Sequence, residues 1–267
     1  MLLRLAVDLS KRRTIPPRAI SWRRYDALCQ GDERTTAPRG ARQAHQIQAP
    51  ILYRGIPIVI KRACDIAVAS IGLVLLSPLL LLLAVAIKVS SPGPVFYRGE
   101  RIGRYGQPFR IFKFRSMVVD AEKLGGSSSG DDDPRITPIG RFMRKCKLDE
   151  LPQLINVLLG DMSMVGPRPE VARFVAMYTP EERVILTIRP GITDWASLWN
   201  SDEGAILAGA EDPDQAYLEL IRPTKIRLQL KYVEERSLGT DMRILVLTVL
   251  RLLQKDRIPE EIRSLCQ

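Results

Sequence analysis

The hydrophobic pattern of this chain is dominated by residues 66–87, a run of 22 residues without a charged side chain. As an α-helix the run would be roughly 33 Å long at about 1.5 Å per residue, which is comparable to the hydrocarbon thickness of a bilayer. The pattern therefore predicts a helix that enters a membrane.

Two features argue against a simple spanning helix. Pro78, preceded by Ser77, lies at the middle of the run, where proline removes a backbone hydrogen bond and bends or breaks a helix. The Ser77 hydroxyl can satisfy a carbonyl that this break leaves free. Basic residues flank both ends of the run: Arg54, Lys61 and Arg62 before it, and Lys88, Arg98, Arg101, Arg104, Arg110, Lys113 and Arg115 after it. Because positive residues favour the cytoplasmic side, we predict a re-entrant helix that returns to the side from which it entered; a kinked spanning helix is the alternative.

Short segments in which apolar and polar residues alternate follow the run. Residues 95–98 and 108–116 have this pattern and enclose a glycine-rich turn, which predicts two strands. The two strands would form a small β-ribbon near the membrane surface, where its arginines can contact headgroups or a diphosphate.

The C-terminal half shows helical patterns separated by breaks. We expect helices at residues 170–178 and 180–188, a loop-rich segment to about residue 213, and a helical stretch at 214–235 that is interrupted near Pro223. The apolar segment at residues 242–253 is too short to cross a bilayer. It is therefore expected either to lie in the membrane interface or to pack on the core.

The candidate chemistry centres on the adjacent carboxylates Asp149 and Glu150. The apolar residues that follow repeat at helical spacing until Gly160, so a short amphipathic helix is expected to begin near Asp149, with Pro152 in its first turn. A carboxylate at or beside a helix N-cap accepts backbone N–H groups and lies at the positive end of the helix dipole. Both effects favour the ionised form, which suits a nucleophile.

Cationic side chains surround this pair in the sequence: Arg141, Arg144, Lys145, Lys147 and Arg168. Helix N-termini and arginine side chains both bind phosphate, so the acid pair and its basic collar together indicate phosphoryl chemistry. Arg115, at the end of the predicted ribbon, and Arg141 are also candidates for phosphate binding. Without the collar, the pair would be interpreted as an ordinary N-cap followed by a first-turn Glu.

Composition narrows the function further. The 267 residues include 40 basic and 30 acidic side chains, and the basic excess lies before residue 116, on both sides of the apolar run. This location favours anionic membrane or phosphorylated substrates over nucleic acid, for which no recognition motif is present.

His45 is the only histidine, which argues against a Ser-His-Asp triad, a Cys-His dyad or a histidine-ligated zinc site. The cysteines form no CxxC pair, which is typical of reduced thiols in a cytosolic setting: Cys29, Cys64, Cys146 and Cys266.

Residues 125–133 form a polar loop that is rich in glycine, serine and aspartate. No Gly-Lys-Ser or Gly-Lys-Thr sequence follows it, which excludes a P-loop. The consecutive carboxylates of Asp131, Asp132 and Asp133 could bind a divalent cation, although an exposed acidic run usually binds only water.

Five motifs follow one another between about residues 57 and 253: KRACDIAVASIGLVLLSPLLLLLAVAIK, GPVFYRGERIGRYGQPFRIFKFRSM, DPRITPIGRFMRKCKLDELPQLINVLLGDMSMVGPRP, RPGIT and YVEERSLGTDMRILVLTV. In this combination the chain resembles the monotopic phosphoglycosyl transferases, the bacterial sugar transferase family that starts polysaccharide and glycoconjugate assembly on a polyprenyl phosphate. Each motif alone is a weak signal, whereas the ordered series is specific.

The resemblance implies a two-step reaction at the cytoplasmic face of a bacterial inner membrane, in exopolysaccharide, O-antigen or glycoconjugate assembly. Asp149, assisted by Mg²⁺ bound at that carboxylate, would attack the sugar-bearing phosphorus of a UDP-sugar and release UMP. The phosphosugar would stay on Asp149 until polyprenyl phosphate accepts it. Glu150 would act as a general base or as a second acidic group near the metal, and Arg144 and Arg168 would hold phosphate.

The predicted fold is mainly α with a small β-ribbon: a monotopic membrane protein held by the re-entrant helix and by amphipathic interfacial helices. Residues 51–90 would form the re-entrant helix region, and residues 91–267 a cytoplasmic catalytic region that continues from it as one domain. Residues 1–50 are basic and contain no long apolar segment, so a signal peptide is not expected. We expect a disordered extension that either contacts anionic headgroups or is simply solvated.

Three features depart from the family pattern. Lys147 replaces a small or polar residue, Asp194 replaces a common glycine, and residues 1–50 have no evident counterpart. These differences bear on substrate choice and partners more than on the chemistry. A non-catalytic basic membrane adaptor is the competing interpretation, and UMP release from a UDP-sugar separates the two. The sequence identifies neither the sugar nor the pathway, and it leaves the oligomeric state open, a homo-oligomer included.

Overall fold

The longest element is the helix α3, Ile58–Ser90, which contains the whole uncharged run. The computed structural model describes residues 58–126 and 128–253, all within one unit, Gln48–Gln267. Among the described residues, α3 is the one helix that is long and apolar enough to cross a membrane, and only 11% of its most apolar stretch is buried. Large apolar side chains are exposed along it: Ile58, Val59, Ile60, Ile66, Val68, Ile71, Val74, Leu75, Leu81, Leu82, Val85 and Val89. Such a surface is suited to lipid rather than water.

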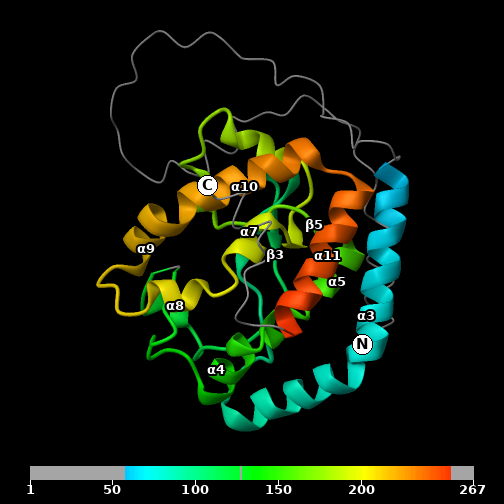
Figure 1. Ribbon diagram of the computed structural model, residues 1–267. Helices are drawn as coiled ribbons and strands as arrows, with labels where there is room; N and C mark the ends of the chain where they lie inside the picture. The colour runs from blue at the N-terminus through cyan, green and yellow to red at the C-terminus, as the bar shows by residue number, and fades with distance from the viewer. Residues whose placement is uncertain (1–57, 127, 254–267) are drawn as a thin grey trace. The chain divides into compact units, whose positions relative to one another are not determined.

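Helix α3 is bent into two arms, as Figure 1 shows. Pro78 lies inside the helix and has no N–H group to donate to the carbonyl of Val74, four residues earlier. The Ser77 hydroxyl donates to that same carbonyl over 2.8 Å. The Ser77 side chain thus replaces the hydrogen bond that proline removes.

Both arms of α3 pack on the same body of the protein. In the first arm, the buried Ala69 and its neighbour Leu73 pack against Leu154 and Val157 of α5, Gln153–Leu159. In the second arm, Leu83 and Ile87 form a cluster with two other buried residues, Phe114 and Met143. The bend thus brings two separate apolar clusters onto one unit, which a straight helix of this length would not do.

The predicted β-ribbon is present, in two pieces. Strand β1, Phe96–Tyr97, pairs antiparallel with β4, Lys113–Phe114. Strand β2, Glu100–Ile102, pairs antiparallel with β3, Pro108–Arg110, and the 3-10 turn Arg104–Gly106 joins them. Gly106 has a φ of 71°, a conformation that favours glycine and permits the tight reversal.

A second, parallel strand pair was not predicted. Strand β5, Ser163–Val165, pairs with β6, Gly191–Thr193, in the register Ser163↔Gly191. The backbones approach so closely that a Cβ atom on Gly191 would lie 2.1 Å from the Gly166 nitrogen. This contact therefore requires glycine at positions 166 and 191. It fixes residues 167–169, here called the PRP loop, next to the strand pair.

A helix that was not predicted, α4, Pro138–Lys145, lies in the sequence between the ribbon and α5. Its N-cap is Thr137, whose hydroxyl accepts from the Gly140 N–H over 3.1 Å. Proline at the first helical position and threonine before it are ordinary start signals. A 3-10 turn, Ala121–Lys123, precedes α4.

The C-terminal half is more finely divided than its pattern suggested. The expected helix at 170–178 is reduced to α6, Ala172–Val175, and the one at 180–188 is the 3-10 helix Glu182–Thr187. The expected loop contains α7, Trp195–Trp199, and α8, Glu203–Leu207. The stretch at 214–235 comprises three consecutive elements: α9, Pro213–Ala216, the π-helical turn Tyr217–Ile221, and α10, Arg222–Glu235. Pro223 lies in the first turn of α10, a position at which proline is common.

The last described helix, α11, Leu238–Leu253, has two different apolar faces. Ile244 is fully buried in a cluster with Trp195 and Tyr232. The opposite face exposes Met242, Val246, Val249, Leu250 and Leu252. Helix α11 therefore packs on the core with one face and leaves an apolar surface on the other. The fold class is confirmed as mainly helical with small sheets, whereas the predicted 1–50 extension lies outside the described residues.

Candidate active site

Asp149 lies in the 3-10 turn Leu148–Glu150, between α4 and α5. The expectation that α5 begins near Asp149 is wrong, since α5 begins at Gln153 with Pro152 as its N-cap residue. Lys147, with a φ of 56°, turns the chain sharply after α4 and separates the 3-10 turn from that helix. Asp149 is thus presented by a tight turn rather than by the N-terminus of a helix.

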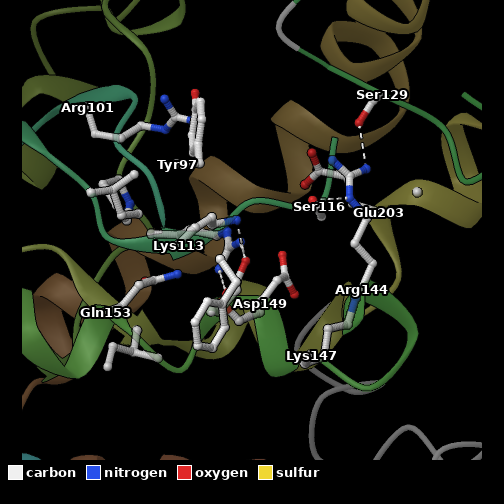
Figure 2. Close-up of a pocket in the computed structure, with 18 of the residues that line it drawn as sticks. Tyr97, Arg101, Lys113, Ser116, Ser129, Arg144, Lys147, Asp149, Gln153 and Glu203 are labelled. Carbon is white, nitrogen blue, oxygen red and sulfur yellow. Dashed lines mark hydrogen bonds and ion pairs between the residues drawn. The ribbon is translucent and has the colours of Figure 1, made fainter. Parts of the chain in front are cut away.

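A pocket of about 1580 Å³ opens beside this turn, and we call it the dyad pocket after Asp149 and Glu150. All six residues predicted for catalysis or phosphate binding line it: Arg115, Arg141, Arg144, Asp149, Glu150 and Arg168. Figure 2 shows the Asp149 carboxylate directed into this dyad pocket, although only 7% of the residue is exposed. Within the described part of the chain, this carboxylate has no hydrogen-bond or ion-pair partner. Its oxygens are therefore available to a ligand.

Glu150, in contrast, is fully engaged. Lys113 forms an ion pair with its Oε1 at 2.7 Å, and Arg168 binds both oxygens, with a distance of 2.9 Å from Nη1 to Oε2. Burial alone would raise the pKa of Glu150, but the charges of Arg168 and Lys113 outweigh it and hold that pKa well below its usual value. Glu150 therefore stays ionised and holds two cations in fixed positions.

The environment of Asp149 shifts its pKa in the opposite direction. Burial raises the pKa of Asp149, and the negative charge of Glu150 adds to the shift, while Lys113, Arg144 and Lys147 partly oppose it. The sequence-based expectation that a helix start favours the ionised form is corrected, because desolvation outweighs the surrounding cations. A carboxylate that has already lost its water and has no partner has little to give up when it bonds to phosphorus.

Arg144, from α4, reaches the pocket between two hydroxyl groups. Its Nε donates to Ser116 Oγ and its Nη1 to Ser129 Oγ, both over 3.0 Å; Figure 2 shows the second bond. Hydroxyl groups orient a guanidinium without neutralising it. The charge of Arg144 thus acts on Asp149 and on any anion that enters the pocket.

The other two predicted phosphate-binding arginines differ from each other. Arg115 is 5% exposed, and its terminal nitrogens donate to the carbonyls of Ser91 and Pro92, which fixes the chain just after α3. Arg141 is an exposed residue of α4 at the edge of the pocket. Arg115 thus has a clear structural contact, and phosphate binding by either residue stays a prediction.

Asp194, which departs from the family pattern, has a structural explanation. It is completely buried, and its Oδ1 accepts from the Ser197 N–H over 2.7 Å, which caps α7. Its Oδ2 accepts from the backbone N–H of Arg168 over 3.2 Å. Asp194 therefore connects α7 to the PRP loop and helps to place Arg168 beside Glu150.

Sequence reasoning missed three residues of this site. Lys113 was noted only as a basic residue after the apolar run, and its pairing with Glu150 depends on strand β4. Ser129 and Glu203 line the pocket from a loop and from the start of α8. Alternation within the ribbon could have indicated Lys113, whereas no local pattern marks Ser129 or Glu203.

The pocket offers a carboxylate that fits a Mg²⁺ ion bound together with substrate phosphates. The part of the chain that the structure describes holds no group of three or more His, Cys, Asp or Glu side chains that could ligate a metal. In the acidic loop, Asp133 is paired with Arg135 at 2.6 Å, and Asp132 accepts from the Gly209 N–H over 3.0 Å. Mg²⁺ commonly takes one or two carboxylates together with substrate phosphates and water. The free oxygens of Asp149 fit that arrangement.

The described structure thus combines a bent helix with an exposed apolar surface and a basic pocket around an unpaired carboxylate, and such a pocket is suited to a phosphorylated ligand. The comparisons with known proteins agree. Residues 56–255 match the family described as bacterial sugar transferase, and the chain belongs to this family.

Three relatives show the range of the family. The chain is 39% identical over 202 residues to a UDP-glucose:undecaprenyl-phosphate glucose-1-phosphate transferase of Escherichia coli, covering 74% of this chain and 41% of the relative. It is 40% identical over 193 residues to a UDP-N-acetylgalactosamine-undecaprenyl-phosphate N-acetylgalactosaminephosphotransferase of Aeromonas hydrophila, covering 71% and 43%. A UDP-glucose:undecaprenyl-phosphate glucose-1-phosphate transferase of Caulobacter vibrioides is 39% identical over 201 residues, covering 73% and 70%. The match thus spans less than half of the first two relatives, and relatives at nearly equal identity differ in the sugar.

Proposed function

We propose that the protein transfers a sugar-1-phosphate from a UDP-sugar to undecaprenyl phosphate, as the first membrane step of polysaccharide or glycoconjugate assembly. The names of its relatives support the two substrates. The observation that carries the proposal is the division of the dyad: Glu150 is held by two cations, and Asp149 is left free in a basic pocket.

The chemistry follows from this division. Asp149 attacks the phosphorus that bears the sugar, a carboxylate–phosphorus bond forms, and UMP leaves with the electron pair of the broken P–O bond. A phosphate oxygen of undecaprenyl phosphate then attacks the same phosphorus and releases Asp149. Mg²⁺, when bound with the diphosphate, would offset its negative charge.

The contacts of Glu150 favour one of its two expected roles. Its low pKa makes it a poor proton acceptor, and the acceptor phosphate is itself an anion that needs no general base. Glu150 is therefore proposed to position Lys113 and Arg168 for the diphosphate. Arg144, held by serine hydroxyls, would supply a further charge on the opposite side of Asp149.

The covalent step has a direct test. Purified protein incubated with a UDP-sugar labelled in the sugar, Mg²⁺ and no acceptor should retain label on the peptide that contains Asp149, and UMP should appear in equal amount. Adding undecaprenyl phosphate should then remove the label. If UMP appears only when acceptor is present and no label is retained, the covalent mechanism is wrong; if no UMP appears with any UDP-sugar, the adaptor interpretation replaces it.

We also propose that α3 is re-entrant and that both of its ends lie at the cytoplasmic face of the inner membrane. The packing of both arms on one body supports this topology, because a spanning helix would have to release one of the two clusters. The topology also brings the dyad pocket to the headgroup level, where a soluble nucleotide and a lipid phosphate can meet. Cysteines at positions 58 and 92, in a variant without the native cysteines, should both be labelled from the cytoplasm. Labelling of the two positions from opposite sides would show a spanning helix.

A further inference from the structure

A second cavity, of about 60 Å³, lies at the N-terminal end of α3 and shares no lining residue with the dyad pocket. Five cations and one carboxylate line this arginine cavity: Lys61, Arg62, Arg104, Arg189, Arg236 and Asp65. They come from α3, from the turn of the ribbon, from the segment before β6 and from the end of α10. The fold thus gathers these charges from four separate parts of the chain.

The one carboxylate of the cavity is already engaged. Asp65 pairs with Lys61 at 2.7 Å and accepts from the Ser163 hydroxyl over 2.8 Å. Lys61 pairs in addition with Asp241 of α11 at 2.8 Å. Among the described residues, Arg62, Arg104 and Arg189 form no ion pair. Their positive charge is therefore not neutralised by direct contact with a carboxylate.

Backbone carbonyls hold these three guanidinium groups in place. Arg62 donates to two carbonyls at and just after the end of α5, over 3.3 and 3.4 Å. Arg189 uses its Nε for the Gly160 carbonyl, and Arg104 uses its Nε for the Thr187 carbonyl, both over 3.0 Å. Within the described structure, the terminal Nη atoms of Arg104 and Arg189 have no hydrogen-bond partner, although the Arg104 guanidinium lies over the Tyr105 ring. Two oriented forks with free donors are suited to a phosphate group.

Convergence of the cations is unfavourable without an anion. Burial lowers the pKa of Arg189, and the neighbouring charges of Arg104 and Arg62 lower it further. The cavity has room for about four water molecules, which is comparable to the volume of one phosphate group. Both observations indicate a small, multiply accepting anion.

The rim of the cavity indicates where that anion comes from. Ile58 lines the cavity and is 53% exposed, and the adjacent Val59 is 73% exposed. Both side chains belong to the lipid-suited surface of α3. The Lys61–Asp241 pair also brings the start of α11 to this place, next to the exposed Met242. A basic cavity beside an apolar surface matches a lipid, whose phosphate and acyl chains need the two surfaces together.

We propose that the arginine cavity binds the phosphate group of an anionic phospholipid, with the Nη donors of Arg104 and Arg189 as its main contacts. The acyl chains lie along the exposed apolar side of α3. Free inorganic phosphate shares the headgroup chemistry but cannot use the apolar rim. The site is separate from the dyad pocket, so lipid binding here does not depend on the transfer reaction.

Thermal denaturation of the full chain in a neutral detergent tests the proposal. Phosphatidylglycerol should raise the Tm of the wild type, while phosphatidylcholine with the same acyl chains and inorganic phosphate should not. In the Arg104→Gln/Arg189→Gln variant the apparent affinity for phosphatidylglycerol should fall about tenfold or more. The Arg227→Gln/Lys231→Gln variant removes two charges from α10 outside the cavity and should respond as the wild type does.

If the double variant does not fold, the single variant Arg104→Gln is used instead, because it removes one hydrogen bond, to the backbone carbonyl of Thr187. It should also weaken the phosphatidylglycerol response. Equal responses of the wild type and the cavity variants would overturn the proposal. A shift of equal size with inorganic phosphate would overturn the lipid assignment, and a response to both lipids alike would show that headgroup charge is not recognised.

Discussion

The dyad pocket and the arginine cavity are both basic, but different groups hold their cations. In the dyad pocket, Lys113 and Arg168 contact the carboxylate of Glu150. In the arginine cavity, the hydrogen bonds of Arg104 and Arg189 go to backbone carbonyls, and neither side chain forms an ion pair among the described residues. The single carboxylate of Glu150 offsets one of the two positive charges that it orients, whereas a backbone carbonyl orients a cation and leaves its full charge for a ligand. In the proposed mechanism the dyad pocket therefore concentrates reactivity on Asp149, whereas the arginine cavity is suited to binding without chemistry.

Replacing the free carboxylate should have the largest effect. Asp149→Asn should lower UMP release from a UDP-sugar by at least about 10³-fold, because the nucleophile is lost. The Tm should stay equal or rise, since the variant removes a buried carboxylate that has no partner. Glu235→Gln, an exposed carboxylate of α10, is the matched control and should change neither quantity. Near-normal activity of Asp149→Asn would refute its role as the nucleophile.

Replacing the engaged carboxylate, Glu150, should lower the stability of the fold. Glu150→Gln leaves Lys113 and Arg168 without their shared countercharge and should lower the free energy of unfolding by about 3 kcal/mol. Urea denaturation in detergent measures this change. Arg168→Gln should also destabilise, and the double variant should cost less than the two single changes together, because they share one interaction. Strict additivity would contradict the contact.

Replacing Arg144, which two serine hydroxyls orient, should affect activity less than replacing Asp149 does. Arg144→Lys keeps the charge but cannot donate to Ser116 and Ser129 in the same way. We expect KM for the UDP-sugar to rise about tenfold with little change in Tm. Arg227→Lys, on the exposed side of α10, is the control. An unchanged KM would mean that Arg144 does not contact the donor.

The pH dependence should show the smallest but most specific effect. Asp149 must be ionised to attack, and its pKa is raised by burial, so single-turnover UMP formation should fall as the pH is lowered through a value above the usual range of Asp. Lys147→Met removes a charge that lowers this pKa, so the acid limb should move to higher pH. Protonated Asp149 favours the folded state, and this contribution to stability is lost as the pH rises through the raised pKa. An acid limb at the ordinary Asp value would contradict the desolvated environment.

Several features of this protein could be predicted from the sequence because their causes are local. The length of the uncharged run, the missing N–H of Pro78 and the neighbouring hydroxyl of Ser77 already determine a bent apolar helix. The ribbon follows from its alternation and its glycines. The ordered motifs indicate the family to which the chain belongs, and within them the sequence marks four site residues. The structure brings all four to one pocket: Arg144, Asp149, Glu150 and Arg168.

What the tertiary structure decided depends on contacts between distant residues. Glu150 is engaged and Asp149 is free because Lys113, 37 residues away, and Arg168, 18 residues away, meet on one carboxylate and not on the other. Nothing in an Asp-Glu dipeptide specifies that choice. The same holds for the arginine cavity, where Arg104 and Arg189 are brought together by backbone carbonyls. Local chemistry thus determines which groups a chain carries, and only packing decides which of them are neutralised.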